Sequence, residues 1–253
     1  MTTVQEPPSV APEAPPVSPQ PSPVAQPPAA AFPAEWTVAD VLEQLGGVPL
    51  HRVRAVPPLG MATENDVLEA KSRIGRICEL VDGVLVEKTM GYYESLVAAL
   101  LIRVLVDFVE KHRLGIVLGE GGTLKVLPGQ VRIPDVCFIA WGRFADGRLP
   151  AEPIPAVAPD LAVEVLSAGN TPGEMQRKLR DYFQAGVRLV WYLDPKVRSV
   201  QVYTAPDQVA VVDQQGTLDG GDVLPGFRLG LAEFFARVQT SAPGADKEAE
   251  KET

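Results

Sequence analysis

Two apolar stretches, Arg132-Ile-Pro-Asp135-Val-Cys-Phe-Ile-Ala140 and Leu161-Ala-Val-Glu164-Val-Leu166, decide the fold. Both are short and rich in β-branched or other bulky apolar residues, which is typical of strands in the core of a sheet. Each also carries one carboxylate among apolar neighbours. A helical pattern follows at about 173–184, and a further apolar strand at 188–193. This order predicts a mixed sheet with helices packed against it.

A hairpin and a long helix precede these strands. Asp82-Gly83 stands between two runs of alternating apolar residues, 76–80 and 84–88, which is a strong signal for a β-hairpin. Between Tyr92 and His112, apolar residues recur at helical spacing on a wide face. Further elements are expected as helices from Thr37, from Thr63 to Ala70 and at 231–238, and as strands at 116–118, 123–126, 199–203 and 209–212. The sequence therefore predicts one mixed α/β domain.

The two ends of the chain differ in composition from the rest. The chain has 253 residues, 25 prolines and a formal net charge of −9. Residues 1–36 contain eleven of the prolines and carry −3, residues 240–253 carry −2, and −4 therefore remains on 37–239. Segments with so little apolar bulk cannot offset the entropy lost on ordering. We expect a disordered proline-rich arm over 1–36, one folded domain over 37–239 and a disordered charged tail over 240–253.

Composition also excludes several classes of protein. The prolines lack a glycine period, which excludes a collagen-like chain, and the acidic balance excludes a strongly basic, histone-like binder. The two cysteines, Cys78 and Cys137, are too few for a disulfide framework and are expected to be buried, reduced thiols. No signal-peptide pattern is present, and the longest apolar run, 96–105, is too short to span a bilayer. The expected location is the cytoplasm, with no membrane partner.

Asp135 and Glu164 are the main candidates for chemistry. A carboxylate in a buried strand loses hydration worth several kcal/mol unless a partner compensates it. Two of them in successive core strands indicate a shared cation site, and oxygen ligands suit Mg²⁺ or Mn²⁺. Lys178, on the following helix, could lean over the end of the Glu164 strand and stabilise charge on a phosphoryl group or position a water. The alternatives are two structural acids, and a surface Lys178 paired with Glu174 at i, i+4 spacing.

Four stretches carry a family resemblance through their order and spacing. They are Arg132-Ile-Pro-Asp135-Val, Pro159-Asp-Leu-Ala-Val-Glu164-Val-Leu-Ser167, Lys178-x-x-x-Tyr182-x-x-x-Gly186-Val and Val190-Trp-Tyr-Leu-Asp194-Pro195. Together with the hairpin sequence Glu79-Leu-Val-Asp-Gly83, they resemble the Uma family, which is classed with restriction endonucleases in the PD-(D/E)XK nuclease superfamily. The resemblance covers roughly residues 60–236.

The resemblance implies a restriction-endonuclease-like mixed β-sheet flanked by helices. Asp135 and Glu164 would bind a divalent metal, Mg²⁺ or Mn²⁺, that activates water for phosphodiester hydrolysis. The superfamily motif has a lysine two residues after its second acid, where this chain has Leu166. The Uma pattern instead places a lysine on the following helix, and Lys178 matches that position.

Two other acids are candidates for an additional site carboxylate. Glu79 lies in the hairpin, and a structural salt bridge is an equally good interpretation of it. Glu94 opens the long helix, where the superfamily often has an acid facing the site, but an acid in a first helical turn is also favoured by the helix dipole alone.

The sequence thus predicts a metal-dependent endonuclease acting on DNA, with Asp135, Glu164 and Lys178 as catalytic residues. Two other functions stay open. One is a catalytically silent binding or scaffolding module that keeps the nuclease fold, because an acidic core is a poor electrostatic partner for a phosphate backbone. The other is a metal-dependent hydrolase of RNA or nucleotides. A homodimer is a further expectation, because nucleases that cut both strands often work as dimers, although no dedicated interface is legible in the sequence.

Overall fold

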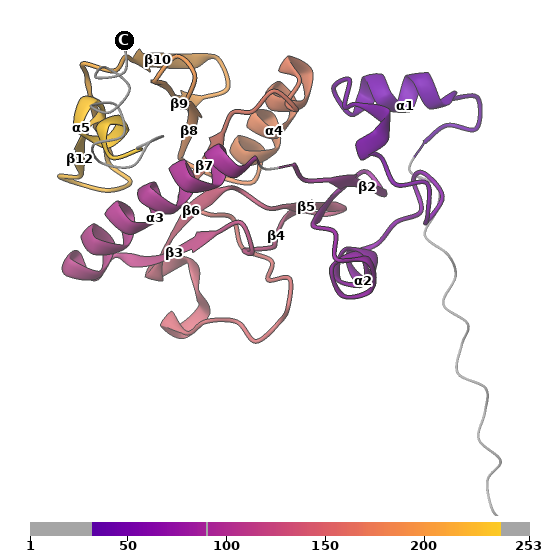
Figure 1. Cartoon of the computed structure of the whole chain (residues 1–253). Coiled ribbons are helices and arrows are strands. Elements are labelled where there is room, and N and C mark those ends of the chain that lie inside the picture. Colours follow the sequence, from indigo (N-terminus) through magenta and orange to yellow (C-terminus); the bar gives the residue numbers. More distant parts are fainter. Residues whose placement is uncertain (1–31, 90, 239–253) are drawn as a thin grey trace, which may run out of the picture.

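The computed structural model describes residues 32–89 and 91–238, arranged as three sheets and five α-helices (Figure 1). The helices are α1 (Val38–Gln44), α2 (Glu64–Ile74), α3 (Tyr92–His112), α4 (Pro172–Gln184) and α5 (Leu231–Ala236), with short 3-10 turns η1 (Leu50–Arg52), η2 (Trp141–Arg143) and η3 (Ala145–Gly147). Of the expected disordered segments 1–36 and 240–253, the structure describes residues 32–36, which form a turn with the rings of Phe32 and Trp36 stacked 5.5 Å apart. The rest of both segments lies outside the described residues, so that expectation stays a prediction.

A six-stranded mixed sheet forms the centre of the molecule. Its strands are β10 (Gln208–Val212), β9 (Ser199–Ala205), β8 (Leu189–Asp194), β7 (Leu161–Val165), β6 (Val136–Ala140) and β3 (Gly115–Gly119), in this spatial order. Strands β7 and β8 run parallel and the other neighbours run antiparallel. The sheet is therefore mixed, as the sequence predicts.

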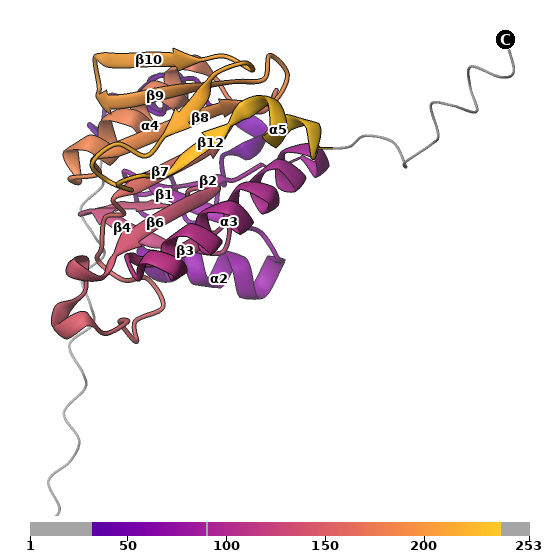
Figure 2. The ribbon, with the colours of Figure 1, turned by 90° about the vertical axis from the view of Figure 1, so that its left-hand side faces the viewer.

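Helices cover both faces of this sheet. In Figure 2, α3 and α5 cross in front of it, while α4 lies behind. Leu161, Val163 and Val165 pack in the core with α3, whereas Ala162 packs with Leu179 and other residues of α4. Because side chains alternate between the faces of a strand, Glu164 belongs to the α4 face. The two faces of β7 thus differ: one is wholly apolar and the other carries the acid.

A second sheet lies beside the first. Its order is β2 (Val84–Glu87), β1 (Cys78–Val81), β5 (Gln130–Arg132) and β4 (Leu124–Leu127), and the predicted hairpin forms β1 and β2. Gly83 occupies the turn with a φ of 71°, where a side chain would also clash with the backbone of Gly60. Helices α1 and α2 pack at this end of the molecule (Figure 1). A small third sheet pairs β11 (Thr217–Asp219) with β12 (Arg228–Gly230), and the sequence interpretation missed it.

The prediction of one strand over 132–140 is wrong. The stretch divides into β5, in the second sheet, and β6, in the central sheet. Pro134 lies at the division, and proline interrupts a ladder because it has no N–H to donate. Asp135 therefore lies at the entrance to β6 rather than inside a strand. The chain passes from one sheet to the other at this point.

Several other boundaries differ slightly. Helix α2 runs to Ile74 rather than Ala70, and Gly75 ends it in the left-handed conformation with a φ of 64°. Helix α3 has the predicted bounds. The final helix, α5, ends at Ala236 rather than 238. The two-residue difference in α5 is normal for a helix end, whereas α2 is four residues longer than predicted. Neither difference changes the class of fold, so the mixed α/β prediction is confirmed.

Candidate active site

The strand register brings Asp135 and Glu164 together. Val136 of β6 pairs antiparallel with Val163 of β7, so one further step of the same register sets Asp135 opposite Glu164. Opposite residues of an antiparallel pair project to the same face, with Cβ atoms roughly 4.5–5.5 Å apart. The N–H of Val165 donates a hydrogen bond of 2.6 Å to Asp135 Oδ2. The structure therefore brings the two acids close together, and their sharing of a cation stays a prediction.

Helix α4 places two polar side chains on Glu164. Thr171 caps the helix by accepting a hydrogen bond from the N–H of Glu174, and Pro172 suits the first turn. Lys178 and Tyr182 lie one turn apart and face the sheet. Lys178 Nζ is 3.1 Å from Glu164 Oε2, and the Tyr182 hydroxyl donates a hydrogen bond of 2.5 Å to Glu164 Oε1. Both carboxylate oxygens of Glu164 are thus held by α4.

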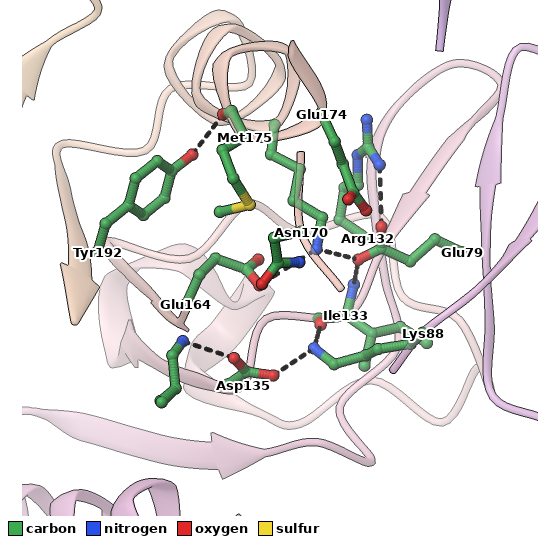
Figure 3. A network of polar contacts seen from close by, with 12 residues as sticks. Glu79, Lys88, Arg132, Ile133, Asp135, Glu164, Asn170, Glu174, Met175 and Tyr192 are labelled. Atoms are coloured by element: carbon green, nitrogen blue, oxygen red, sulfur yellow. Dashed lines mark hydrogen bonds and ion pairs between the residues drawn. The ribbon is translucent and has the colours of Figure 1, made fainter. Parts of the chain in front are cut away.

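Glu79 of β1 completes this group from the second sheet. Its Oε1 is 3.1 Å from Lys178 Nζ and also accepts a hydrogen bond of 3.1 Å from the N–H of Ile133. Arg132 donates to Glu79 Oε2 at 2.9 Å. Figure 3 shows these contacts converging from the two sheets. The sequence left a structural salt bridge and a site role as equal alternatives for Glu79. In the structure Glu79 pairs with Arg132, as a structural acid would, and also with Lys178, a predicted site residue.

Glu94 is not brought into the cluster. It lies half-buried in the first turn of α3, where a Cβ built on Gly91 would be 2.1 Å from Glu94 Oε2, so the carboxylate lies against that glycine. Within the described part of the chain, no ion pair or hydrogen bond joins Glu94 to Lys88, Lys178 or another residue of the cluster. The geometry therefore favours the alternative interpretation, an acid at a helix N-terminus.

Lys88 is the site residue that the sequence interpretation missed. It follows β2, and its Nζ lies 2.8 Å from Asp135 Oδ1 and also donates to the carbonyl of Ile133. Its side chain is only 4% exposed. The residue stands between Glu87 and Thr89 at the end of a hairpin strand, where a lysine looks like an ordinary surface residue. Only the buried partner, far away in sequence, distinguishes it.

The alternative pairing of Lys178 with Glu174 does not form. Arg52 donates to both oxygens of Glu174 at 2.8 Å, and also to the carbonyls of Glu87 and Gly169 at 2.9 Å. Lys178 is 3% exposed, so the interpretation as a surface lysine is wrong. The reason is that α4 turns this side of its first two turns toward the sheet, where Met175, Lys178 and Leu179 are buried.

A second set of ion pairs fixes the elements that carry the site. Arg132 contacts Asp181 of α4, with its Nε 3.1 Å from Asp181 Oδ2. Arg177 of α4 donates to Asp82, in the hairpin turn, at 2.6 Å. Both pairs join the second sheet to α4. They hold the hairpin against the helix that carries Lys178.

Burial and the shared lysine give the two glutamates opposite pKa shifts. Burial alone would raise the pKa of Glu79, but Lys178, Arg132 and Lys88 outweigh it and lower the pKa to about 2. Burial raises the pKa of Glu164 above its ordinary value, because Lys178 and Lys88 only partly offset the desolvation and the charges of Asp135 and Glu79 add to it. The pKa of Lys178 is raised despite its burial, because Glu164 and Glu79 favour its charged form. Lys178 is therefore a permanent cation.

The residues present fit a divalent cation. Asp135, Glu164 and Glu79 are each no more than 4% exposed, and their oxygens are the ligand type that Mg²⁺ and Mn²⁺ prefer. Burial raises the pKa of Glu164, and the charges of Asp135 and Glu79 add to this rise; a cation held by Asp135 and Glu164 would oppose both effects. Over residues 32–89 and 91–238, no three side chains of His, Cys, Asp or Glu form a complete metal-binding group. Protein ligation would come from two carboxylates, with waters and substrate oxygens supplying the rest, as is usual for Mg²⁺.

The mixed sheet, its flanking helices and this acid–lysine cluster define a nuclease-like fold. Residues 67–232 match the Uma2 family, described as "Putative restriction endonuclease". The match covers more than half of the chain, so the chain belongs to this family, which confirms the resemblance seen in the sequence.

A solved structure has a similar fold. It is the crystal structure of a protein from Anabaena variabilis whose title reads "putative nuclease belonging to DUF820", with a TM-score of 0.58 and 19% sequence identity, and the match covers 65% of this chain and 93% of that one. At this identity the likeness concerns the fold alone. No curated protein matches the chain. In the part of the chain that the structure describes, no helix has the length and apolar character needed to cross a membrane.

Proposed function

We propose that this protein is a metal-dependent endonuclease that hydrolyses DNA phosphodiester bonds in the cytoplasm. The observation that carries the proposal is the pair Asp135 and Glu164, which are both buried and close enough for their charges to interact, next to the register pair Val136 and Val163 of the central sheet. Membership of the Uma2 family supports the reaction class. Mg²⁺ or Mn²⁺ is the cofactor that the oxygen donors suit.

In this mechanism the chain's own residues prepare the site. Asp135 and Glu164 would hold the metal, which when bound supplies a water of lowered pKa and stabilises charge on the phosphate. The N–H of Val165 orients Asp135, and Lys178 and Tyr182 each fix one oxygen of Glu164. Lys178 also pairs with Glu79 and keeps that buried carboxylate compensated. The positive charge of Lys178 would therefore lie beside Glu164 during the reaction.

A cleavage assay with isosteric variants tests this function. The full chain is incubated with supercoiled plasmid DNA in Mg²⁺, in Mn²⁺ and in chelator, alongside Asp135→Asn and Glu164→Gln. We expect metal-dependent cleavage that falls by at least about 100-fold in both variants, because loss of several kcal/mol of transition-state stabilisation corresponds to such a factor. Glu69→Gln is the matched control, because Glu69 forms an exposed i, i+4 pair with Arg73.

Persistence of cleavage in both site variants would refute the assignment. The same assay with single-stranded DNA and with RNA at fixed salt decides between DNA and the RNA alternative. Sedimentation of the active protein tests the expected homodimer.

A second candidate is a binding module that keeps the fold without catalysis. The observation that favours it is charge balance, because Glu79, Asp135 and Glu164 face three cations: Lys88, Arg132 and Lys178. Calorimetry separates the two functions. Saturable Mg²⁺ or Mn²⁺ binding supports the nuclease, and its absence supports the binding module.

A further inference from the structure

The cation nearest to Asp135 is the ammonium group of Lys88. It lies 2.8 Å from Asp135 Oδ1, on a side chain that is 4% exposed, and also donates to the carbonyl of Ile133. The other oxygen, Asp135 Oδ2, accepts the N–H of Val165. Among the described residues, the partner of Oδ1 is thus the ammonium of Lys88, whereas that of Oδ2 is a backbone N–H.

Lys88 and a metal ion compete for the same oxygen. A Mg²⁺ ion bound to a carboxylate lies about 2.0–2.1 Å from the oxygen. If Lys88 kept its present contact, its ammonium would stand within a few ångströms of that ion, with both cations buried from water. Like charges repel strongly under these conditions. The ammonium and the metal therefore cannot share Oδ1 favourably.

Lys88 is also better able to leave than Lys178. Lys178 is held between two carboxylates, Glu79 and Glu164, at 3.1 Å from each. Among the described residues, Lys88 forms an ion pair with one carboxylate, Asp135, and its second acceptor is the backbone carbonyl of Ile133, while its charge acts on Glu79 and Glu164 without an ion-pair contact. That carbonyl can keep a hydrogen bond to the ammonium after the contact with Asp135 is lost.

We propose that Lys88 is an intramolecular competitor for the metal site, whose ammonium pairs with Asp135 in the metal-free protein and is displaced from Oδ1 when the metal binds. The inference rests on the proposed function, because it takes Asp135 as a metal ligand. Its consequence is that Lys88 weakens metal binding. Removal of the lysine charge then strengthens binding, whereas loss of a merely structural residue would weaken it.

Calorimetry of the full chain with Mn²⁺ and with Mg²⁺ alone tests this inference. Lys88→Met removes the charge and keeps most of the side-chain length, and we expect it to bind metal at least about tenfold more tightly than the wild type. Lys88→Arg keeps the charge and should retain the weaker affinity. The control is Lys125→Met, because Lys125 pairs at 2.6 Å with Glu64 on a partly exposed surface. An affinity of Lys88→Met equal to or below that of the wild type overturns the inference.

Two further variants address misfolding of Lys88→Met and the location of the bound metal. Lys88→Gln is shorter and can still donate to the carbonyl of Ile133, so it replaces Lys88→Met if that variant does not fold, and the same increase in affinity is expected. Adding Asp135→Asn to either variant should abolish the gain, which locates the bound metal. If neither the wild type nor the neutral variants bind metal, the inference is overturned.

The outcome is separable from that of the proposed function. Tighter metal binding by Lys88→Met in a protein that cleaves no nucleic acid supports the competitor and refutes the nuclease. Metal-dependent cleavage by the wild type, with unchanged affinity in Lys88→Met, supports the nuclease and refutes the competitor.

Discussion

Replacement of Lys178 by methionine should destabilise the folded protein strongly. The substitution keeps the length of the apolar stem and removes the ammonium that lies 3.1 Å from both Glu79 and Glu164. Both carboxylates are buried, so neither can recover the lost interaction from water. Glu79 keeps Arg132 as an ion-pair partner, whereas Glu164 keeps the hydrogen bond from the Tyr182 hydroxyl and the more distant charge of Lys88.

The expected magnitude follows from these distances. At 3.1 Å and an effective dielectric constant of about 20, each attraction is roughly 5 kcal/mol before desolvation. Desolvation of the ammonium cancels a large part of the sum, and removal of one partner of a buried pair typically costs about 3–5 kcal/mol. Because a domain is stable by only about 5–15 kcal/mol, such a loss is a large fraction of the total.

The effect should also depend on pH. In the wild type the pKa of Glu79 is lowered to about 2, so the stability from this group is present above its ordinary pKa of 4.5 and is lost as the pH falls toward 2. Lys178 lowers the pKa of both glutamates, so its removal raises both. The variant then gains stability by taking up a proton as the pH falls. The difference from the wild type should therefore narrow from pH 8 to pH 5.

Urea unfolding at pH 8 and pH 5 measures this difference, with tryptophan fluorescence, to which the buried Trp191 contributes, as the signal. Lys125→Met, which breaks a partly exposed pair, should change the free energy of unfolding by no more than about 1 kcal/mol. A loss below about 1 kcal/mol for Lys178→Met at pH 8, or a larger loss at pH 5 than at pH 8, would refute the reasoning.

Two further predictions concern the surroundings of the site. Arg52→Met should lower the free energy of unfolding in urea by about 3–5 kcal/mol, because it leaves the buried Glu174 without its cation. Arg52→Lys should restore little of this stability, since a lysine cannot reproduce the bidentate contact. Full restoration by lysine would contradict this prediction. Burial raises the pKa of Cys78 to about 11 and that of Cys137 to about 12, so neither thiol should react with a disulfide reagent at pH 8 until urea unfolds the protein. Rapid labelling of the native protein would show that one of them is accessible.

The sequence predicted those parts of the site that carry a local signal. Asp135 and Glu164 stand out because a carboxylate among apolar strand residues is unusual, and the helical stripe around Lys178 indicates which side of α4 is buried. Their exact register was not predictable, because it depends on where Pro134 ends one strand and another sheet begins. The error over 132–140 arose because the apolar run continues across that change of sheet.

Glu94 and Lys88 show two ways in which local sequence patterns fail to predict a site: a predicted residue that lies elsewhere, and a site residue that was not predicted. Glu94 stands at a position that the family resemblance favours, yet its carboxylate lies against Gly91. Lys88 stands at a position with no local signal, yet its ammonium contacts Asp135. Periodicity identifies which residues share a face of one element. It says nothing about which side chain of a distant element meets them there, because that is set by tertiary packing.

The cluster therefore depends on the hairpin as much as on the central sheet. Glu79 and Lys88 come from the hairpin sheet, whereas Asp135, Glu164 and Lys178 come from the central sheet and α4. The family match begins at residue 67, ahead of the hairpin, and so includes both contributors. Because the hairpin supplies Lys88 to Asp135, any displacement of the hairpin would change which cation occupies that carboxylate. If Lys88 competes with a metal ion for Asp135, as we propose, metal binding and docking of the hairpin are coupled through this one lysine.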